Sequence, residues 1–460
     1  MIGLRRARGF FSADLFGAPF FLAPLAFFFI VPSSGRQASV TAGISIASVS
    51  RVLLLLPTTT YRAPDFLAAA DKLGIEVTVA SERSSTMENF NPTGLLTLDF
   101  ADREGSVRAA TGFAARHPID AVVGVDDDTT EVAAAISAAL GLPHNPTEAV
   151  AATRNKARMR AVLAWAGVRS PRHWLFHASD SDSAAAVEVS YPCVLKPTFL
   201  SASRGVIRAD DPEAFRLAWR RIAALLALPD VRAKGGEAAD EILVEEFAGG
   251  DEVALEGLLT GGDLAVLALF DKPDPLEGPF FEETIYVTPS RKPPPLQDAI
   301  TEATRSACRA LGLVDGPIHA ELRCGAAGIS IIEVAARSIG GLCSRTLRFG
   351  AGISLEELIL RHALRGESVA PEREAGAAGV LMIPIPRAGR LDAVRGLEAA
   401  RAVSGIREIT ISAHVGQSLV PLPEGSRYLG FLFSRAATPE EAEAALRAAH
   451  ARLTFVIEGA

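Results

Sequence analysis

The chain has 460 residues with a formal net charge of −8, and 49% of its residues are apolar. This length allows about two to four domains with substantial cores, and the composition is globular rather than disordered. The negative charge argues against a nucleic-acid surface as the main function. The four cysteines include no CxxC pair, which argues against a zinc ribbon or a thioredoxin-like site and indicates free thiols in a reducing compartment.

Residues 1–50 have the pattern of a targeting or anchoring segment, which conflicts with the reducing compartment that the cysteines indicate. Three early arginines precede an apolar run from Leu15 to Val31, an outline typical of a signal peptide or a membrane anchor. Pro19 and Pro24 weaken the anchor interpretation. We favour a third interpretation, a non-native extension from an upstream start site, because the chemistry inferred below needs cytosolic ATP. We therefore expect a cytoplasmic protein that contacts a membrane only if this segment is retained.

Residues 51–145 alternate between strand and helix signals. Short apolar runs predict strands at 51–56, 75–80, 94–99 and 119–125, with helices at 64–73, 107–117 and 129–140. This alternation predicts an open parallel sheet with helices on both faces. No G-x-G-x-x-G follows the first strand, so a dinucleotide fingerprint is absent. The acids Asp126, Asp127 and Asp128 follow the fourth strand, where they either contact a substrate or cap the next helix.

The middle of the chain carries lysines beside small polar residues. Residues 146–167 form a basic helical segment that, taken alone, is best explained as a solvated helix face. A strand at 191–197 carries Lys196 at its end, and the polar stretch 198–205 leads into another strand at 206–208. A lysine next to hydroxyls and unpaired N–H groups suits a triphosphate. A strand at 241–247 then ends in acids, which either face solvent or bind an adenine amino group and a ribose diol.

Further elements follow in the same region. The runs 253–259 and 264–270 predict a hairpin, and helices are expected within 289–312 and at 355–364. From residue 379 a new unit begins, with a strand, a helix near 391–402, strands at 406–411 and 428–434, and a closing helix at 439–451. We expect this unit to be a small α+β domain packed on the centre.

The stretch 317–341 predicts two strands joined by a tight turn at Gly325–Gly328. Alternation with a period of two, and a loop at 326–328, place Glu321 directly across from Glu333. Facing carboxylates repel, so the pair indicates a cation between them, such as Mg²⁺ with phosphates on its open side. Arg337 then offers a fork for an anion, and Gly340 a close backbone approach. An ordinary half-exposed hairpin with solvated charges is the alternative.

The order of these signals resembles the ATP-grasp superfamily, and the layout is most similar to carboxylate–amine ligases of the L-amino acid ligase type. The resemblance covers the chain from about Val52 to the C-terminus, with its motifs between Lys156 and Gly341. It implies an α/β protein with an N-terminal parallel α/β (pre-ATP-grasp) domain at 51–145, a central ATP-grasp α+β domain at 146–370 and a small α+β domain at 371–460.

The resemblance also implies residues that bind ATP. Lys156 and Lys196 would hold the phosphates, with Lys196 also close to the adenine. Glu245 and Phe247 would line the adenine hinge, and Glu252 would bind the ribose. The flexible phosphate loop would contain Ser201, Ser203 and Gly205.

For the metal and the reaction, the resemblance implies five more residues. Glu321 and Glu333 would bind Mg²⁺ or Mn²⁺, and His319 would lie against the phosphates. Arg337 would steady an acyl phosphate, and Gly340 would present its backbone N–H to the developing anion.

The chain departs from the family at residue 335. The family usually has Glu-x-Asn, whereas this chain has Glu333-Val334-Ala335, and alanine offers no oxygen to a second metal. Either water supplies that ligand, or the site holds one metal tightly and the other loosely. The phosphate loop also has fewer glycines than many relatives. The lysines, the carboxylates and Arg337 remain, so we expect an active enzyme.

The expected reaction is amide or peptide bond formation. A substrate carboxylate attacks the γ-phosphate of ATP to give an acyl phosphate and ADP, and an amine, often that of an amino acid, then displaces phosphate. The expected partners are a small-molecule carboxylate and amine, with no nucleic acid, and a homodimer is left open. Two alternatives stay open: a related enzyme that carboxylates or formylates a small metabolite, and a nucleotide-binding protein without turnover, which Ala335 suggests.

Overall fold

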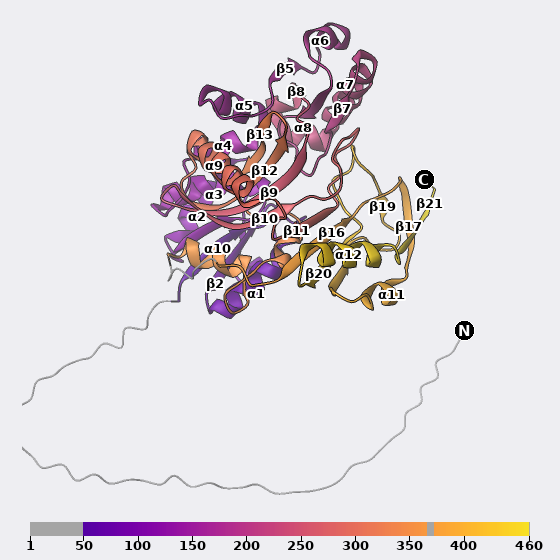
Figure 1. The fold of residues 1–460 in the computed structure, drawn as a ribbon. Helices are drawn as coiled ribbons and strands as arrows, with labels where there is room; N and C mark the ends of the chain where they lie inside the picture. Colours follow the sequence, from indigo (N-terminus) through magenta and orange to yellow (C-terminus); the bar gives the residue numbers. More distant parts are fainter. Residues whose placement is uncertain (1–48, 366–371, 460) are drawn as a thin grey trace, which may run out of the picture. The chain divides into compact units, whose positions relative to one another are not determined.

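The computed structural model describes residues 49–365 and 372–459, which form one compact unit. The apolar run that suggests a signal peptide or anchor lies outside the described residues. Among the helices that are described, none has both the length and the apolar character to cross a bilayer. Figure 1 shows the order of the elements along the chain.

The N-terminal part is the predicted parallel sheet. Its strand order is β3-β2-β1-β4, with β1 (Arg51–Leu55), β2 (Glu76–Ser81), β3 (Leu95–Thr97) and β4 (Ala121–Gly124). The flanking helices are α1 (Ala63–Leu73), α2 (Arg103–Ala114) and α3 (Asp127–Leu140), and a 3-10 turn η1 spans Glu88–Phe90. Leu54 of β1 packs in a cluster with Phe66 of α1, while Leu55 packs with Phe113 of α2 and Ile136 of α3. Both faces of the sheet are therefore covered, as the continuous apolar run predicted.

The basic segment folds as two helices rather than one. Asn155 separates α4 (Thr147–Arg154) from α5 (Lys156–Trp165), because its extended backbone interrupts the helix and its side chain caps the N–H of Arg158. Lys156 and Arg160 lie one turn apart on α5 and are only 8% and 0% exposed. The solvated-face interpretation is therefore wrong for these two residues.

A small antiparallel sheet and three helices make up residues 173–246, which we call the cap subdomain. Its strand order is β5-β8-β6-β7, with β5 (His173–His177), β6 (Cys193–Pro197), β7 (Ile207–Ala209) and β8 (Glu241–Glu246). The helices are α6 (Asp182–Glu188), α7 (Pro212–Leu226) and α8 (Pro229–Gly235), followed by η2 (Gly236–Asp240). Phe215 and Trp219 of α7 pack with Leu195 and Val244 of the sheet, so the cap subdomain has a core of its own.

The largest sheet has eight strands in the order β13-β12-β9-β10-β11-β16-β20-β18. These are β9 (Asp251–Thr260), β10 (Asp263–Asp271), β11 (Ile285–Thr288), β12 (Gly316–Gly325), β13 (Gly328–Ala335), β16 (Ala377–Ile383), β18 (Ile406–Ile411) and β20 (Gly430–Ala436). The predicted hairpin of β9 and β10 is present. Strands from the C-terminal region continue the sheet, so that region packs on the centre through β11 and β16.

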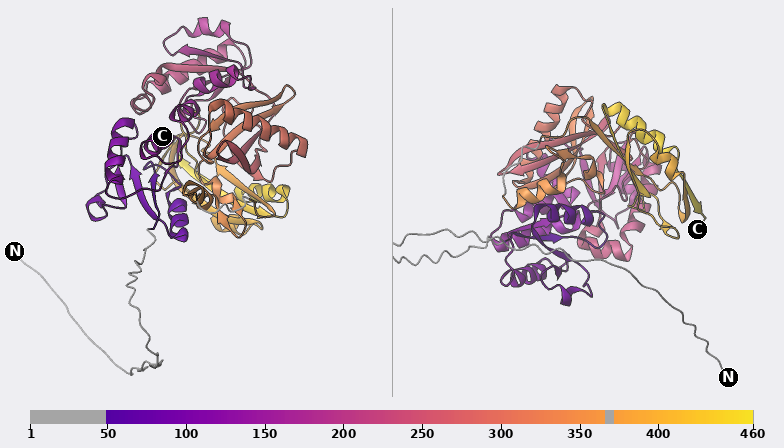
Figure 2. Two further views of the ribbon diagram at one scale, coloured as in Figure 1. Left: turned by 90° about the vertical axis from the view of Figure 1, so that its left-hand side faces the viewer. Right: turned by 90° about the horizontal axis from the view of Figure 1, so that it is seen from below.

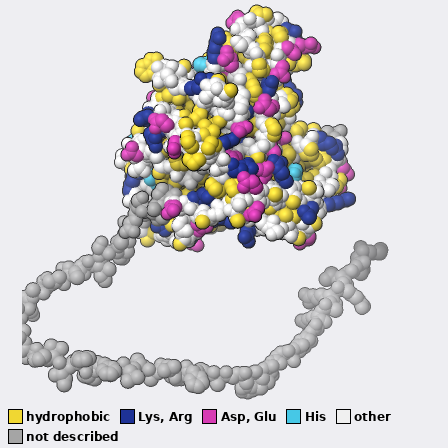
Figure 3. All heavy atoms as spheres, in the orientation of Figure 1, with side chains coloured by type: hydrophobic (Ala, Val, Ile, Leu, Met, Phe, Trp, Pro, Cys, Tyr) yellow, Lys and Arg dark blue, Asp and Glu magenta, His cyan; other side chains and the backbone are white. Residues whose placement is uncertain are grey.

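Helices and short elements complete this part of the chain. They are α9 (Pro294–Leu311), η3 (Cys343–Thr346), β14 (Arg348–Phe349), β15 (Ile353–Ser354), α10 (Leu355–Ala363) and α12 (Pro439–His450). Figure 2 shows the same elements from two further directions. On the face drawn in Figure 3, basic and acidic side chains are interspersed.

The helix expected near 391–402 is wrong over its first half. Residues 389–395 form strand β17 (Gly389–Arg395), and only α11 (Leu397–Arg401) is helical. β17 lies between β19 (Ser418–Leu419) and β21 (Thr454–Glu458), and the pairing with β21 joins residues about sixty positions apart. Gly396 ends the strand with φ 85°, and a Cβ there would lie 1.9 Å from the Arg452 carbonyl oxygen. Distant pairing therefore overrides the local helical signal.

Candidate active site

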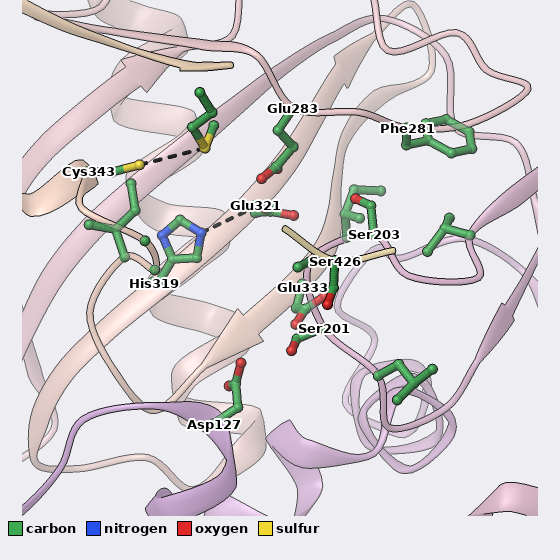
Figure 4. Close-up of a pocket in the computed structure, with 18 of the residues that line it drawn as sticks. Asp127, Ser201, Ser203, Phe281, Glu283, His319, Glu321, Glu333, Cys343 and Ser426 are labelled. Carbon is green, nitrogen blue, oxygen red and sulfur yellow. Dashed lines mark hydrogen bonds and ion pairs between the residues drawn. The ribbon is translucent and has the colours of Figure 1, made fainter. Parts of the chain in front are cut away.

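The predicted site residues converge on one cavity of 340 Å³. Its walls come from the parallel sheet, the cap subdomain, the eight-stranded sheet and the C-terminal region. Figure 4 shows Asp127, Ser201, Glu321 and Glu333 around this space. Each predicted ATP, metal or catalytic residue lines the cavity except Gly205. Residues far apart in the sequence are therefore brought together as their order suggested.

The hairpin of β12 and β13 places Glu321 directly across from Glu333, as predicted. The route to this register differs from the expected one. Gly325 pairs with Gly328, so the turn is shorter than the loop 326–328, and a β-bulge at Ile332 shifts the register back by one residue. Arg160 donates a 2.6 Å hydrogen bond to the Ile332 carbonyl, which satisfies the bulged backbone.

Two lysines lie on the walls next to acidic partners. Lys156 Nζ lies 3.4 Å from Glu333 and donates to the Leu200 carbonyl at 2.7 Å. Lys196 Nζ lies 2.6 Å from Glu245 Oε2. Burial lowers the pKa of Lys196, although the Glu245 charge opposes that shift. Both ammonium groups are thus held at the cavity, where an anionic ligand can exchange with their carboxylate partners.

Glu245 is buried rather than solvent-facing. Burial raises its pKa, but the charges of Arg160 and Lys196 outweigh burial and lower the pKa to about 2. Arg160 Nε lies 2.7 Å from Glu245 Oε1, yet the two groups are not aligned as a hydrogen bond. Sequence reasoning did not assign a site role to Arg160. Its spacing of four residues from Lys156 on a helix was the available signal.

Lys272 sits among three carboxylates that sequence reasoning only partly identified. Its Nζ lies 2.6 Å from Glu252, 2.5 Å from Glu283 and 2.9 Å from Glu321. Burial lowers the pKa of Lys272, but these three acids raise it well above its usual value. Burial also raises the pKa of Glu283 to about 7, against the opposing charge of Lys272. Lys272 and Glu283 were missed, because a lysine just after a strand and an acid in a loop carry no distinctive spacing.

Two separate ammonium groups lie beside the opposed carboxylates of Glu321 and Glu333. Lys272 neutralises Glu321, and Lys156 lies beside Glu333. Ligand atoms of Glu252, Glu283 and Glu321 lie within 4.8 Å of one another. Carboxylate oxygens are the donors that a hard divalent cation prefers, so this donor set fits Mg²⁺ or Mn²⁺.

Paired strands align further charges on the same sheet. His319 lies opposite Glu256, and Arg323 opposite Glu252, across β9 and β12. His319 Nδ1 is hydrogen-bonded to Glu256, and His319 Nε2 lies 3.4 Å from Glu321. Period-two alternation places Arg323 on the same face of β12 as His319 and Glu321, although no site role was predicted for it. Glu256 was missed, and its signal was a single acid within the apolar run 253–259.

The loop after β13 is held by the N-terminal part of the chain. Arg337 Nη2 donates to Asp127 Oδ2 at 2.8 Å, and Arg62 donates to Ser338 Oγ at 2.6 Å and to the Val125 carbonyl at 3.0 Å. Asp126 is the N-cap residue of α3, and all three acids, Asp126, Asp127 and Asp128, line the cavity. A Cβ built on Gly340 meets nothing within 4 Å, so its backbone borders open space.

The loop 198–205 adopts a tight left-handed path. Ala202 and Ser203 both have φ 55°, and Gly205 has φ 75°. A Cβ on Gly205 would lie 2.9 Å from Pro197 and Leu225, so only glycine fits there. Ser201 and Ser203 line the cavity, and Gly205 shapes the loop from behind. Phe247 packs against Phe281, with ring centroids 6.3 Å apart.

In comparisons with known proteins, three family models match successive parts of the chain. An ATP-grasp N-terminal domain matches residues 67–144, an ATP-grasp domain matches 189–346, and L-amino acid ligase C-terminal domain 2 matches 381–458. The crystal structure of L-amino acid ligase from Bacillus licheniformis is similar to this chain with a TM-score of 0.76 and 27% identity, over 89% of this chain and 99% of that one.

Several of the curated relatives are ligases or synthases by name. Alanine–anticapsin ligase of Bacillus subtilis is 30% identical over 48% of this chain and 49% of its own length. Dapdiamide A synthase of Enterobacter agglomerans is 28% identical over 52% of this chain and 55% of its own length. The matched regions thus span about half the length of these curated relatives.

Proposed function

We propose that this chain, which matches ATP-grasp N-terminal and ATP-grasp domains and an L-amino acid ligase type of C-terminal domain, is an ATP-dependent carboxylate–amine ligase that forms an amide or peptide bond. One observation carries the proposal. A cavity gathers two lysines, a left-handed loop with two hydroxyls and opposed carboxylates, in a chain that ends in the ligase type of C-terminal domain. That ending favours ligation over carboxylation or formylation of a metabolite.

ATP is proposed to bind between the cap subdomain and the eight-stranded sheet. Lys156 and Lys196 would exchange their carboxylate partners for phosphate oxygens, because an ammonium ion is a strong point-charge partner for phosphate. Glu245 and Phe247 would line the adenine, and Glu252 the ribose. The hydroxyls of Ser201 and Ser203 and backbone N–H groups of the loop would contact the phosphates, and Gly205 would keep the loop in shape from behind.

The metal proposal uses the opposed acids. Glu321 and Glu333 would hold Mg²⁺ or Mn²⁺, with Glu283 next to Glu321 as a further oxygen donor in place of the oxygen that Ala335 lacks. When bound, the cation would neutralise part of the phosphate charge. His319, oriented by Glu256, would lie against the phosphates.

The chain's own residues would then position the reacting groups. A carboxylate oxygen of the first substrate attacks the γ-phosphorus of ATP, ADP leaves, and an acyl phosphate forms. Arg337 and the Gly340 N–H would stabilise the charge on the acyl phosphate. The amine nitrogen of the second substrate attacks the acyl carbon, phosphate leaves, and the nitrogen loses a proton. The contribution of the residues is chiefly positioning and charge neutralisation.

The substrates are proposed to be small molecules, one carboxylic acid and one amine, with amino acids as the first candidates. We place the reaction in the cytoplasm because that compartment supplies ATP and keeps the thiols reduced.

The test is phosphate release by the purified protein with ATP, Mg²⁺ and a panel of amino-acid pairs, followed by mass spectrometry of the products. We expect release with at least one pair, and its loss in Lys196→Ala and Glu333→Gln. Glu148→Gln is the matched control, because Glu148 is a surface acid that pairs with Arg158. ATP binding without release for any pair would instead support a nucleotide-binding protein without turnover. Normal turnover by Glu333→Gln would remove the metal assignment.

A further inference from the structure

The phosphate loop of the cap subdomain is tied to a C-terminal segment more than 200 positions away. Gly205 N donates to the Pro423 carbonyl at 2.8 Å. Arg204 Nε donates to the Glu424 carbonyl, also at 2.8 Å. Arg221 of α7 contacts the Glu424 carboxylate through both Nε and Nη2, with 2.8 Å from Nη2 to Oε2. Ser426, just beyond, lines the same cavity as Ser201 and Ser203 (Figure 4).

The loop needs outside support to keep its shape. Ala202 and Ser203 occupy the left-handed region, where residues other than glycine persist only if their surroundings hold them. Inside the loop, Arg204 N donates to the Ser201 carbonyl at 3.3 Å and Val206 N to the Ser203 carbonyl at 3.1 Å. The bond from Gly205 to Pro423 is shorter, and it comes from a different region of the chain.

The contact between the Arg221 and Glu424 side chains has a defined geometry. Arginine offers a planar fork, and a two-point contact with a carboxylate fixes the relative orientation of both groups. Arg221 and Glu424 are both partly exposed, with 45% and 39% of their side-chain surface accessible. Such an exposed pair adds little to overall stability. Its effect is therefore expected on where the loop sits rather than on whether the protein folds.

We propose that residues 421–426 form a clasp that holds the phosphate loop in its ATP-binding shape, with Glu424 as the positioning residue. The nucleotide part of this inference rests on the proposed function, because it takes loop 198–205 as the phosphate-binding loop. The Glu424 side chain acts through Arg221, while its backbone carbonyl accepts from Arg204, and neither group touches the reacting atoms. The C-terminal region thereby contributes to nucleotide binding in the cap subdomain.

The neighbouring residue on α7 gives a matched control. Arg220 pairs with Asp182 at 2.9 Å, and this ion pair stays inside the cap subdomain. Arg220→Ala thus removes an arginine and its ion pair from the same helix but leaves the contact between Arg221 and Glu424 intact. Arg204→Met is a second clasp variant, because it removes the hydrogen bond to the Glu424 carbonyl and leaves the Arg221 pair.

Two measurements on the full chain separate the clasp from the proposed function. Trypsin cleavage after Arg204, located by mass spectrometry without nucleotide, reports whether the loop opens. Calorimetric titration with a non-hydrolysable ATP analogue and Mg²⁺ reports binding. We expect Glu424→Ala to speed cleavage and to weaken analogue binding about fivefold. Arg204→Met should weaken binding similarly, Arg220→Ala should match the wild type in both assays, and the exchange Arg221→Glu with Glu424→Arg should recover most of the loss.

Unchanged cleavage in Glu424→Ala would overturn the clasp, and so would unchanged binding in a wild type that binds the analogue. If the wild type does not bind the analogue at all, the proposed function fails, and cleavage alone decides whether residues 421–426 hold the loop.

Discussion

Arg337 donates a 2.8 Å hydrogen bond to Asp127, so a residue at the start of α3 fixes the side chain that we assign to the acyl phosphate. Burial raises the pKa of Asp127, but the charges of Arg337 and Arg154 outweigh burial and hold that pKa well below its usual value. The carboxylate therefore stays ionised and keeps the guanidinium in place. Asp127, at the start of α3 in the N-terminal part of the chain, thus holds the Arg337 side chain in place at the cavity.

Asp127→Asn is expected to lower the rate of ligation more than it lowers stability. The amide keeps the shape but not the charge, so Arg337 loses its orientation, and we expect kcat to fall about tenfold. Steady-state kinetics with the pair found in the panel measures this. Asp182→Asn is the control, because Asp182 pairs with Arg220 inside the cap subdomain and neither residue lines the cavity. Equal kcat values for Asp127→Asn and the wild type would contradict the positioning role.

Lys272→Met is expected to make stability depend on divalent cations. Glu252, Glu283 and Glu321 would repel one another once their shared ammonium is gone, and breaking such a buried cluster costs about 3–5 kcal/mol. Mg²⁺ can then replace the lost charge, so it should raise the melting temperature of this variant more than that of the wild type. Thermal unfolding at several Mg²⁺ concentrations measures the difference.

Lys292→Met is the control for that experiment, since Lys292 pairs with Asp251, whose side chain is 73% exposed. Its response to Mg²⁺ should match that of the wild type. If Lys272→Met also responds like the wild type, Glu283 and Glu321 do not bind the cation.

His319 is expected to make stability fall at alkaline pH. Burial lowers the pKa of His319, but Glu256 and Glu321 outweigh burial and raise the pKa to about 9. The unfolded chain has the ordinary value of about 6.5. A raised folded pKa contributes stability that is complete below pH 6.5 and is lost as pH rises through about 9.

The loss is at most about 3 kcal/mol, from the separation of the two pKa values. Urea unfolding of the wild type and of His319→Gln between pH 6 and 10 measures it. The difference in unfolding free energy between the two proteins should shrink toward pH 10. A difference that does not change with pH would show that His319 is not charged in the folded protein.

Arg160→Met is expected to destabilise the protein strongly although Arg160 touches no predicted substrate. The change leaves the Ile332 carbonyl without this donor and leaves Glu245 with Lys196 as its close cationic partner. Losing one partner of a buried ion pair costs about 3–5 kcal/mol. Arg158→Met on the same helix should cost less than about 1 kcal/mol, because its pair with Glu148 is exposed. Denaturant unfolding of both variants tests this, and similar losses would contradict it.

The sequence by itself determined the local and ordered features of this protein. The apolar run within 51–56 predicts a buried strand because it places apolar residues on both faces, and strand β1 packs on both sides. Period-two alternation predicts that Glu321 faces Glu333, and the two residues are paired. The order of lysines and acids resembles ATP-grasp, and ATP-grasp family models match residues 67–144 and 189–346.

Tertiary structure decided what depends on residues distant in sequence. Strand β17 forms because β21 is beside it, although residues 391–402 look helical locally. Lys272 reaches three acids from three different segments, and Asp127 reaches Arg337 across 210 positions. The burial and pairing of a charged side chain depend on the residues packed around it in the folded protein. Many of these neighbours come from distant parts of the sequence, so a local sequence pattern does not identify them.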